Sequence, residues 1–379
     1  MNTREETGRA TSDTTVAVEL AEAAGELLLR IRVEGLGSID GRELGRRGDG
    51  AANTFILEEL AARRPGDVVL SEESADDRSR LDADRVWIID PVDGSKEYGI
   101  AGRSDWAVHV ALWERGRGVT AAAVAQPALA VVYSTDDEIR RGNESGSPTI
   151  VVSGSRPPSF TAAVASELNA EVVHMGSAGA KAMAVVRGDV DAYLHAGGQW
   201  EWDSAAPVGV ALAQGLHCSR IDGSPLLYNQ SHPYLPDLVI CRPELADSIL
   251  HAIAEHAAEH AAEHGESAVS GPVAMAREYV KALTSHDATK VRFAAQAWRI
   301  ENGTRTGESG AAISNDLEQG ARYRAIKAVR ELTLRESVGG VVARYLLDVH
   351  GSTEPTRVTE YFAMVAGEIE SVTSIAEPG

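Results

Sequence analysis

The 379-residue chain predicts a mixed protein with an α+β half, an α/β half and a separate C-terminal α+β unit. Residues 13–134 hold two helical segments followed by short strands, whereas residues 150–241 alternate strands with helices. Residues 272–379 begin with helices and end in long alternating stretches, which predict a curved antiparallel sheet. At roughly 100–200 residues per domain, this length predicts two or three domains.

In the first half, apolar residues recur at three- and four-residue spacing behind the helix caps Ser12 and Asp13, which predicts an amphipathic first helix. The Gly-rich polar segment after it predicts a loop, and Pro65-Gly66 ends the second helix. The predicted elements are a helix at 13–32, a loop at 33–50, a helix at 51–64, strands at 68–70 and 86–89, and a hairpin or meander over 106–134 with its turn at 116–118.

The second half continues as strand–helix alternation up to about residue 241. Its predicted helices are 158–169, 178–187 and 204–214, between strands near 149–153, 172–175, 191–196 and 238–241. The run AEHAAEHAAEH within 244–264 predicts a further helix, on which His256, His260 and His264 form one stripe. A solvated linker helix is the favoured interpretation of that stripe, because no Cys or carboxylate completes a closed metal site.

The C-terminal unit predicts helices at 272–285 and near 310–319, a strand at 293–300, and then a strand meander. We therefore expect one unit at 1–250, divided near 149/150, a helical linker at 251–271 and a further unit at 272–379.

Composition and charge exclude several classes of protein. Hydrophobic residues make up 44% and charged residues 24% of the chain, as in ordinary globular proteins. The formal net charge is −20 and no Lys/Arg cluster resembles a stripe that would follow phosphates, which argues against binding a nucleic-acid polymer. No spanning apolar run and no secretory signal occur, so we expect a cytoplasmic protein that does not bind membranes. Cys218 and Cys241 are expected to be free thiols, a single disulfide being the alternative.

Three acidic clusters follow apolar strands or precede a helix: SEES with Glu72, WIIDPVDGSKEY with Asp90 and Asp93, and QWEWDSAAP with Asp203. In the second cluster a buried strand leads to Asp90, and Pro91 is expected to end its hydrogen-bonded ladder. Two carboxylates around one bend repel each other unless a hard cation lies between them, and oxygen-only ligation suits Mg²⁺. A solvent-exposed turn is the alternative, whereas an EF-hand is excluded because its twelfth position would be Ala101.

Taken together, SEES, DPVDGSKEY and EWDSAAP resemble the inositol monophosphatase superfamily of metal-dependent, lithium-sensitive phosphatases. EWDSAA, GSAGAKAMAV and LLYNQ resemble most closely its 3′(2′),5′-bisphosphate nucleotidase (CysQ-type) branch, and the likeness runs from about residue 13 to 250. The resemblance implies a layered αβαβα sandwich. This sequence departs from the family pattern at Ser95, Tyr98 and Pro207, where Thr, Phe and Gly are usual.

The resemblance also implies roles for individual residues. Its metal ligands are Glu72, Asp90, the Val92 carbonyl, Asp93 and Asp203. Its catalytic residues are Asp49 and Ser95, which orient the attacking water, together with Glu72. Its substrate-binding residues are Gly94, Ser95, Ser177, Lys181 and Glu201, with Tyr228 and Asn229 as weaker candidates.

The activity implied is hydrolysis of the 3′-phosphate of adenosine 3′,5′-bisphosphate to AMP, and of the related 3′-phosphoadenylyl sulfate, in sulfur assimilation. Two or three Mg²⁺ ions would activate the water and stabilise the leaving oxygen. An inositol monophosphatase or fructose-1,6-bisphosphatase is the alternative within the class. A non-catalytic ligand-binding protein is the alternative from another class.

The C-terminal unit resembles the SnoaL-like (nuclear transport factor 2-like) family through AREYVKALTSHDATKV, RIENGTRTG and the following meander. That likeness implies an α+β cone with a pocket, dimerisation through the sheet, and a homodimeric protein. Binding or dimerisation is favoured over catalysis, because no acid–base pair is identifiable. The polar candidates are His286, Asp287, Glu301 and Asn302.

Overall fold

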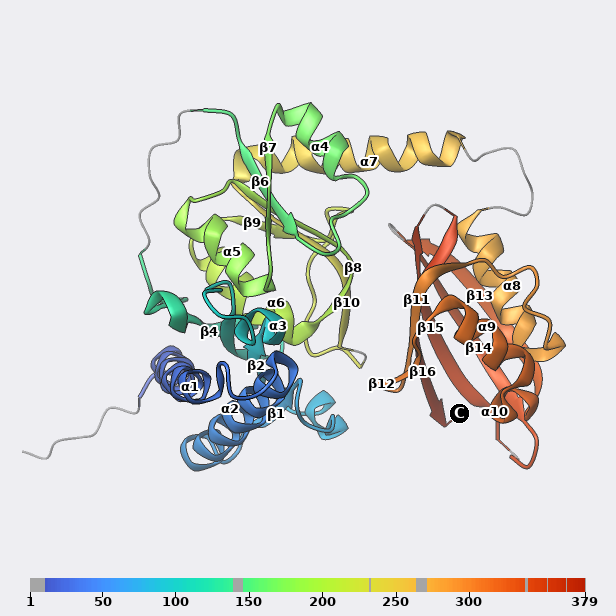
Figure 1. Ribbon diagram of the computed structural model, residues 1–379, viewed down its shortest axis with the longest axis horizontal. Coiled ribbons are helices and arrows are strands. Elements are labelled where there is room, and N and C mark those ends of the chain that lie inside the picture. Colours follow the sequence, from blue (N-terminus) through green and yellow to red (C-terminus); the bar gives the residue numbers. More distant parts are fainter. Residues whose placement is uncertain are drawn as a thin grey trace, which may run out of the picture. The chain divides into compact units, whose positions relative to one another are not determined.

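The computed structural model describes residues 11–138, 146–231, 233–263, 271–337, 340–352, 354–365 and 367–378. The chain divides into two compact units, Met1–Ile253 and Ala254–Gly379, called here the N-terminal and C-terminal units (Figure 1). No helix among the described residues is long and apolar enough to cross a membrane. Cys218 and Cys241 are both free.

The first sheet of the N-terminal unit has the strand order β1-β2-β3-β4-β5, and only β1 and β2 run parallel. Its strands are β1 Val68–Ser71, β2 Arg85–Asp93, β3 Ala107–Glu114, β4 Gly118–Gln126 and β5 Val131–Ser134. Helices α1 (Asp13–Gly35) and α2 (Gly41–Arg63) cover one face with an apolar core. The meander predicted over 106–134 is confirmed.

Helix α2 begins ten residues earlier than the sequence predicted, so residues 41–50 are helical and the predicted loop is wrong there. Asp40 caps the helix, since its Oδ1 accepts from the amides of Arg42 (2.9 Å) and Glu43 (3.0 Å). The glycines that suggested a loop instead permit close packing, because a Cβ at Gly48 would lie 2.9 Å from the Tyr98 ring.

Strand β2 also continues past Pro91 to Asp93, which contradicts the expected end of the ladder. The pairing of β2 with β3 shifts register between Asp90 and Asp93, so the proline lies in an irregular stretch where no regular ladder bond is lost. This irregularity leaves both aspartates at the buried end of the strand.

The second sheet has the order β7-β6-β8-β10-β9, in which β6 pairs in parallel with β7 and β8. Its strands are β6 Thr149–Ser153, β7 Glu171–Met175, β8 Ala192–Trp200, β9 His217–Ser219 and β10 Tyr234–Cys241. The helices of this half are α4 Thr161–Leu168, α5 Ala178–Arg187, α6 Glu201–Ala213 and α7 Ala246–Glu263. Glu201 and Asp203 thus lie in the first turn of α6, not before it.

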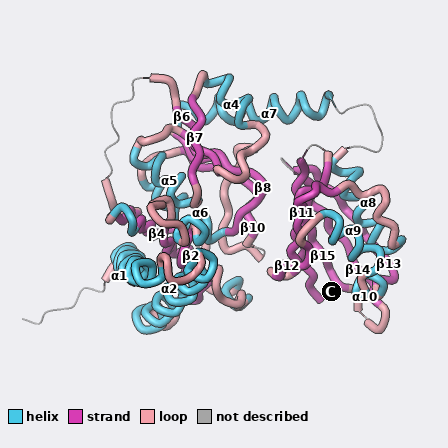
Figure 2. The backbone as a smooth tube through the Cα atoms, in the orientation of Figure 1, coloured by secondary structure: helices cyan, strands magenta, loops and turns pink. Residues whose placement is uncertain are grey.

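Helices α5 and α6 lie between the two sheets and share one apolar core with both (Figures 1 and 2). Figure 1 shows the resulting order of layers, with α1 and α2 outside the first sheet and α4 and α7 outside the second. The predicted αβαβα sandwich is confirmed. His256 lies on α7, whereas the side chain of His260 and all of His264 lie outside the described residues.

The C-terminal unit is a six-stranded sheet of order β12-β11-β16-β15-β14-β13 packed against α8. Its strands are β11 Phe293–Glu301, β12 Thr304–Gly307, β13 Ile326–Ser337, β14 Gly340–Val349, β15 Thr356–Val365 and β16 Glu368–Pro378. Its helices are α8 Pro272–Ser285, α9 Gly310–Gln319 and α10 Ala321–Arg324. The predicted sheet with helices is confirmed, except that β11 pairs with β16 in parallel.

Candidate active site

Three carboxylates from distant parts of the sequence meet inside the N-terminal unit. Asp90 and Asp93 stand at the end of β2 and Asp203 in the first turn of α6, and one oxygen of each lies within 4.8 Å of the others. Asp90 is fully buried and Asp93 is 5% exposed. Sequence analysis placed these three acids in one site, and the fold brings them together.

The environment of Asp90 and Asp203 disfavours negative charge when no cation is bound. Burial, and then the neighbouring acids, raise the pKa of Asp90 well above its ordinary value. Burial and the charge of Asp93 raise the pKa of Asp203 to about 6. Asp90 Oδ2 is buried without a hydrogen-bond partner. An oxygen-only donor set with an unsatisfied buried oxygen fits a hard divalent cation.

Glu72 lies directly after β1 at the exposed rim of this cluster. Desolvation of its carboxyl group and the charge of Asp203 raise the pKa of Glu72. The parallel pairing of β1 with β2 explains its position, because Ser71 lies opposite Ile89 and the next residues of the chain are Glu72 and Asp90. Glu72 can therefore serve as a ligand at the open side of a cation bound by the aspartates.

Asp93 differs from the other acids because positive and polar groups surround it. Although burial opposes its charge, His109, Ser177 and Lys181 lower the pKa of Asp93 to about 2. Its carboxylate accepts from the Ser177 hydroxyl and from the amides of Ala178 (3.0 Å) and Gly179 (2.6 Å) at the start of α5. Asp93 is consequently ionised before any metal binds.

His109 is a site residue that sequence analysis missed. It is fully buried on β3, directly opposite Asp90, and its Nε2 lies 3.3 Å from Asp93 Oδ2. Its Nδ1 lies 3.1 Å from the carbonyl oxygen of Trp202, the residue before Asp203. The only sequence signal for it was a polar residue at an inward position of the apolar run AVHVALW.

Asp49 and Ser95 lie next to each other, one on α2 and the other at the start of the short helix α3 (Ser95–Tyr98). Burial raises the pKa of Asp49 to about 7, although a hydrogen bond with Ser95 opposes this shift. Asp49 Oδ1 is buried and has no hydrogen-bond partner. The single proton of the Ser95 hydroxyl is directed to the Val92 carbonyl at 3.1 Å, so the hydroxyl must turn away from Val92 to donate to Asp49. Gly94 precedes this pair with φ of +87°, a conformation that favours glycine.

The predicted substrate-side residues are mostly engaged within the protein. Lys181 is buried, donates to the carbonyls of Gly176 (2.5 Å) and Ser177 (2.7 Å), and has its pKa lowered by burial to about 8. Its ammonium group is therefore not a solvated surface charge. Glu201 accepts from the amides of Asn229 (2.6 Å) and Gln230 (2.8 Å), which fixes that loop to α6.

Tyr228 and Asn229, the weaker candidates, are also engaged in internal contacts. The Tyr228 hydroxyl donates to Ser204 Oγ at 3.2 Å. Asn229 Oδ1 accepts from the buried Arg80 at 2.7 Å. Both therefore support the start of α6 and its neighbouring loop, and neither is tied to the three carboxylates.

The polar candidates of the C-terminal unit do not form one site among the described residues. His286 ends α8 in the left-handed conformation, and Asp287 Oδ1 accepts from the Thr289 amide at 3.0 Å. Asn302 Oδ1 accepts from the Ala376 amide at 2.9 Å, whereas Glu301 bonds to Tyr323 and Arg322. Each of these contacts supports a turn or a strand end.

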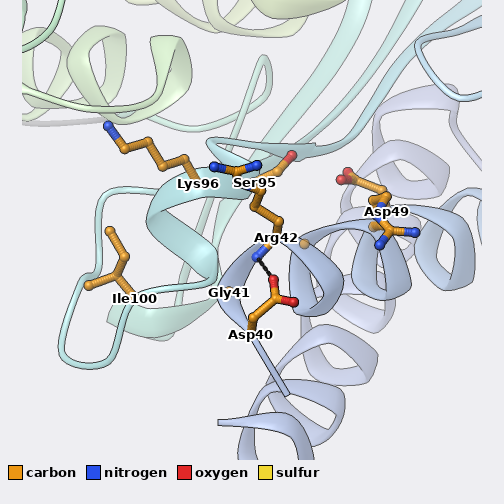
Figure 3. A pocket seen from close by; sticks show the side chains of 9 residues that line it. Asp40, Gly41, Arg42, Asp49, Ser95, Lys96 and Ile100 are labelled. Atoms are coloured by element: carbon orange, nitrogen blue, oxygen red, sulfur yellow. Dashed lines mark hydrogen bonds between the residues drawn. The ribbon is translucent and has the colours of Figure 1, made fainter. Parts of the chain in front are cut away.

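A cavity of about 590 Å³ opens beside Asp49 and Ser95 (Figure 3). Its wall comes from the start of α2 and from the segment around α3. The residues that line it are Asp40, Gly41, Arg42, Gly45, Arg46, Asp49, Ser95, Lys96 and Ile100.

Solved structures share the fold of the N-terminal unit. The staphylococcal IMPase-II matches with a TM-score of 0.54 and 19% identity over 67% of this chain and 99% of that one. The Thermotoga maritima IMPase matches with a TM-score of 0.52 and 20% identity over 64% of this chain and 96% of that one. These two likenesses establish the layered sandwich fold of the N-terminal unit.

The inositol monophosphatase family model matches residues 10–260, and the chain belongs to that family. Residues 270–376 match a domain of unknown function (DUF8021).

Three curated relatives place the chain within this family. The 3′-phosphoadenosine 5′-phosphate phosphatase of Mycobacterium leprae is 56% identical over 64% of this chain and 94% of the relative. The protein of the same name from Mycobacterium tuberculosis is 55% identical over 61% and 90%. The 3′(2′),5′-bisphosphate nucleotidase CysQ of Escherichia coli K12 is 30% identical over 49% and 80%.

Proposed function

We propose that the N-terminal unit hydrolyses the 3′-phosphate of adenosine 3′,5′-bisphosphate to AMP, and that of 3′-phosphoadenylyl sulfate, as a cytoplasmic enzyme of sulfur assimilation. The observation that carries this proposal is the 56% identity to the Mycobacterium leprae phosphatase over 94% of its length. The buried cluster of Asp90, Asp93 and Asp203 supports the metal-dependent chemistry.

Two or three Mg²⁺ ions are the proposed cofactors, with lithium as an inhibitor. Glu72, Asp90, the Val92 carbonyl, Asp93 and Asp203 would hold them. Bound there, the ions supply a water of lowered pKa and neutralise charge on the phosphoryl group. The ionised Asp93 and the unsatisfied Asp90 Oδ2 support this ligand set.

The remaining site residues position the water and the phosphate. Asp49 Oδ1, which is buried and free of partners, would accept a hydrogen bond from the attacking water while the Ser95 hydroxyl orients it. The amides of Gly94 and Ser95 would bind the phosphate. Glu72 would lie next to the attacking water. We propose that Ser177 and Lys181, which are fixed by their contacts at the start of α5, line the substrate side of the site. We propose that Glu201 supports this side of the site through its hydrogen bond with the Asn229 amide.

Parallel assays of phosphate release test this function. Adenosine 3′,5′-bisphosphate and inositol 1-phosphate are compared at equal concentration with Mg²⁺, with and without lithium. Preference for the nucleotide with inhibition by lithium supports the proposal. Preference for inositol 1-phosphate would keep the mechanism and overturn the substrate, and activity on neither would favour a ligand-binding role.

For the C-terminal unit we propose a SnoaL-like binding or dimerisation module, joined to the phosphatase at 1–250 by a linker at 251–271 and making the protein a homodimer. Its helix-backed mixed sheet supports this assignment. Light scattering on the full chain and on a chain ending at residue 253 tests it. A full-length dimer whose truncated form is a monomer supports the proposal. The same number of chains per particle in both proteins contradicts it.

A further inference from the structure

His109 lies between the strands and helices that carry the aspartates of the proposed metal site, and the proposed mechanism gives it no role. It is fully buried on β3 and lies directly opposite Asp90 on β2, so both side chains stand on the same face of the sheet. Helices α5 and α6 pack over this face. Burying an imidazole ring costs free energy unless polar contacts compensate it, so the contacts of the ring indicate its role.

The first contact joins His109 to helix α6. Its Nδ1 lies 3.1 Å from the carbonyl oxygen of Trp202. A carbonyl oxygen can only accept a hydrogen bond, so Nδ1 carries the hydrogen and donates it. Trp202 is the residue before Asp203, whose carboxylate in turn accepts from the Trp200 amide at 2.6 Å. The ring therefore ties β3 to the turn of α6 that presents Asp203.

The second contact joins His109 to Asp93. Its Nε2 lies 3.3 Å from Asp93 Oδ2, an electrostatic contact that is not aligned as a hydrogen bond. The same oxygen accepts from the Ser177 hydroxyl and from the Gly179 amide. Gly179 leaves room for this arrangement, since a Cβ there would lie 2.1 Å from His109 Nε2. One oxygen of Asp93 is thus held both from β3 and from the start of α5.

We propose that His109 is a positioning residue that holds Asp93 and Asp203 at the separation that a divalent cation needs, an inference that rests on the proposed function. The two carboxylates come from distant segments and have oxygens within 4.8 Å of each other, where like charges repel. His109 contacts Asp93 directly and Asp203 through the preceding residue, so one rigid ring links both sides. A site held in this way loses less conformational freedom when the cation binds.

Calorimetric titration of the full chain with Mg²⁺ alone tests this role. H109L makes neither contact and should raise the dissociation constant of Mg²⁺ about 10- to 100-fold, as is typical when a residue that orients a metal ligand is lost. H109N should recover about half of that change or more on a logarithmic scale, because its amide nitrogen can take the place of Nδ1 and donate to Trp202. If H109L does not fold, H109S, whose side chain is too short to reach Trp202, takes its place.

V110A is the matched control. Val110 is the next residue of β3, is fully buried, and lies in the apolar core on the other face of the sheet, with α1 and α2. Its truncation should lower stability through the cavity that it leaves, without changing Mg²⁺ affinity. Denaturant unfolding in EDTA measures the stability of each variant apart from metal binding. The proposal is overturned by wild-type Mg²⁺ affinity in H109L, by affinity in V110A as low as in H109L, or by H109N binding as weakly as H109L.

Hydrolysis assays separate failure of this inference from failure of the proposed function. With adenosine 3′,5′-bisphosphate as substrate, raising the Mg²⁺ concentration should restore kcat in H109L toward the wild-type value. A kcat that stays low at saturating Mg²⁺ would contradict a role in positioning the metal ligands. If the wild type does not hydrolyse the nucleotide, the proposed function fails, and the calorimetric comparison still decides the role of His109. A wild type that binds no Mg²⁺ would overturn the inference.

Discussion

The N-terminal unit gathers Asp90, Asp93 and Asp203 around one point with a single lysine and a histidine nearby, and it leaves Asp90 Oδ2 unsatisfied. The C-terminal unit also buries charge, but there a buried cation is paired with carboxylates of opposite charge. Fully buried Arg299 pairs with Asp316 and, at 3.3 Å, with Glu301.

The difference teaches how to separate a functional acidic cluster from a structural one. Buried charges are stable when paired, as around Arg299, and unfavourable when like charges meet. A cluster that the protein itself leaves uncompensated indicates a partner from outside, here a divalent cation. The following four predictions test this contrast, beginning with the largest expected effect.

Asp93→Asn should lower kcat by at least about a thousandfold, because it removes a charged ligand from the proposed metal site. The fold should survive, since asparagine has the same size and its one oxygen still accepts from one of the two amides, of Ala178 and Gly179, that donate to separate oxygens of Asp93. Phosphate release and circular dichroism of the same preparation check both points. Near wild-type turnover would show that the acidic cluster is not the reaction centre.

Arg299→Met should destabilise the C-terminal unit by about 1.5–3 kcal/mol, because it removes the buried cation of Glu301 and Asp316 and leaves Arg322 as their remaining partner. The kcat of the N-terminal unit should stay near the wild-type value. Denaturant unfolding and the phosphatase assay give the two readouts. A change in the free energy of unfolding below about 1 kcal/mol would mean that this ion pair is not needed for stability. The C-terminal unit would then no longer be an example of a stabilising buried charge.

Removal of metal should affect only the N-terminal unit. Mg²⁺ at about a hundred times its dissociation constant should stabilise that unit by about 2.7 kcal/mol, since the ion binds the folded state alone. Calorimetric melting with Mg²⁺ and with EDTA measures the shift, and Asp90→Asn serves as the variant that should lose it. A similar shift of both units' transitions would contradict a site confined to the carboxylate cluster.

The smallest predicted effect concerns Glu360, which is buried in the C-terminal sheet and accepts from the Tyr345 hydroxyl at 2.7 Å. Burial raises the pKa of Glu360 to about 7 from an ordinary value of 4.5. The folded state then holds a proton that the unfolded state loses, so stability is highest below about pH 4.5 and decreases up to about pH 7.

Over that interval Glu360 should contribute a loss of about 2 kcal/mol. Glu360→Gln keeps an acceptor for Tyr345 but cannot titrate, so it should flatten the decrease. Urea unfolding of wild type and variant at several pH values between 4.5 and 7.5 measures the difference. Parallel stability curves for the two proteins would exclude Glu360 as its source.

Much of the fold was predictable because its signals are local. Apolar periodicity predicted α1 and α8 and the strands β1 to β5, and tight motifs predicted Asp90, Asp93 and Asp203 as one site. The helical start of α2 was not predictable from its glycines. Their role depends on contacts with α3, more than forty residues further along the chain.

The sequence by itself determined the acidic motifs, the apolar pattern of the layers and the family of the N-terminal unit, because these depend on residue types at fixed spacing. Only the tertiary structure decided that His109 contacts Asp93, that Lys181 is buried, and that Arg42 and Lys96 line one cavity. The physical reason is distance along the chain. Contacts between β2, β3, α2, α3 and α5 arise only when the layers pack. No local sequence pattern predicts which side chains then come into contact.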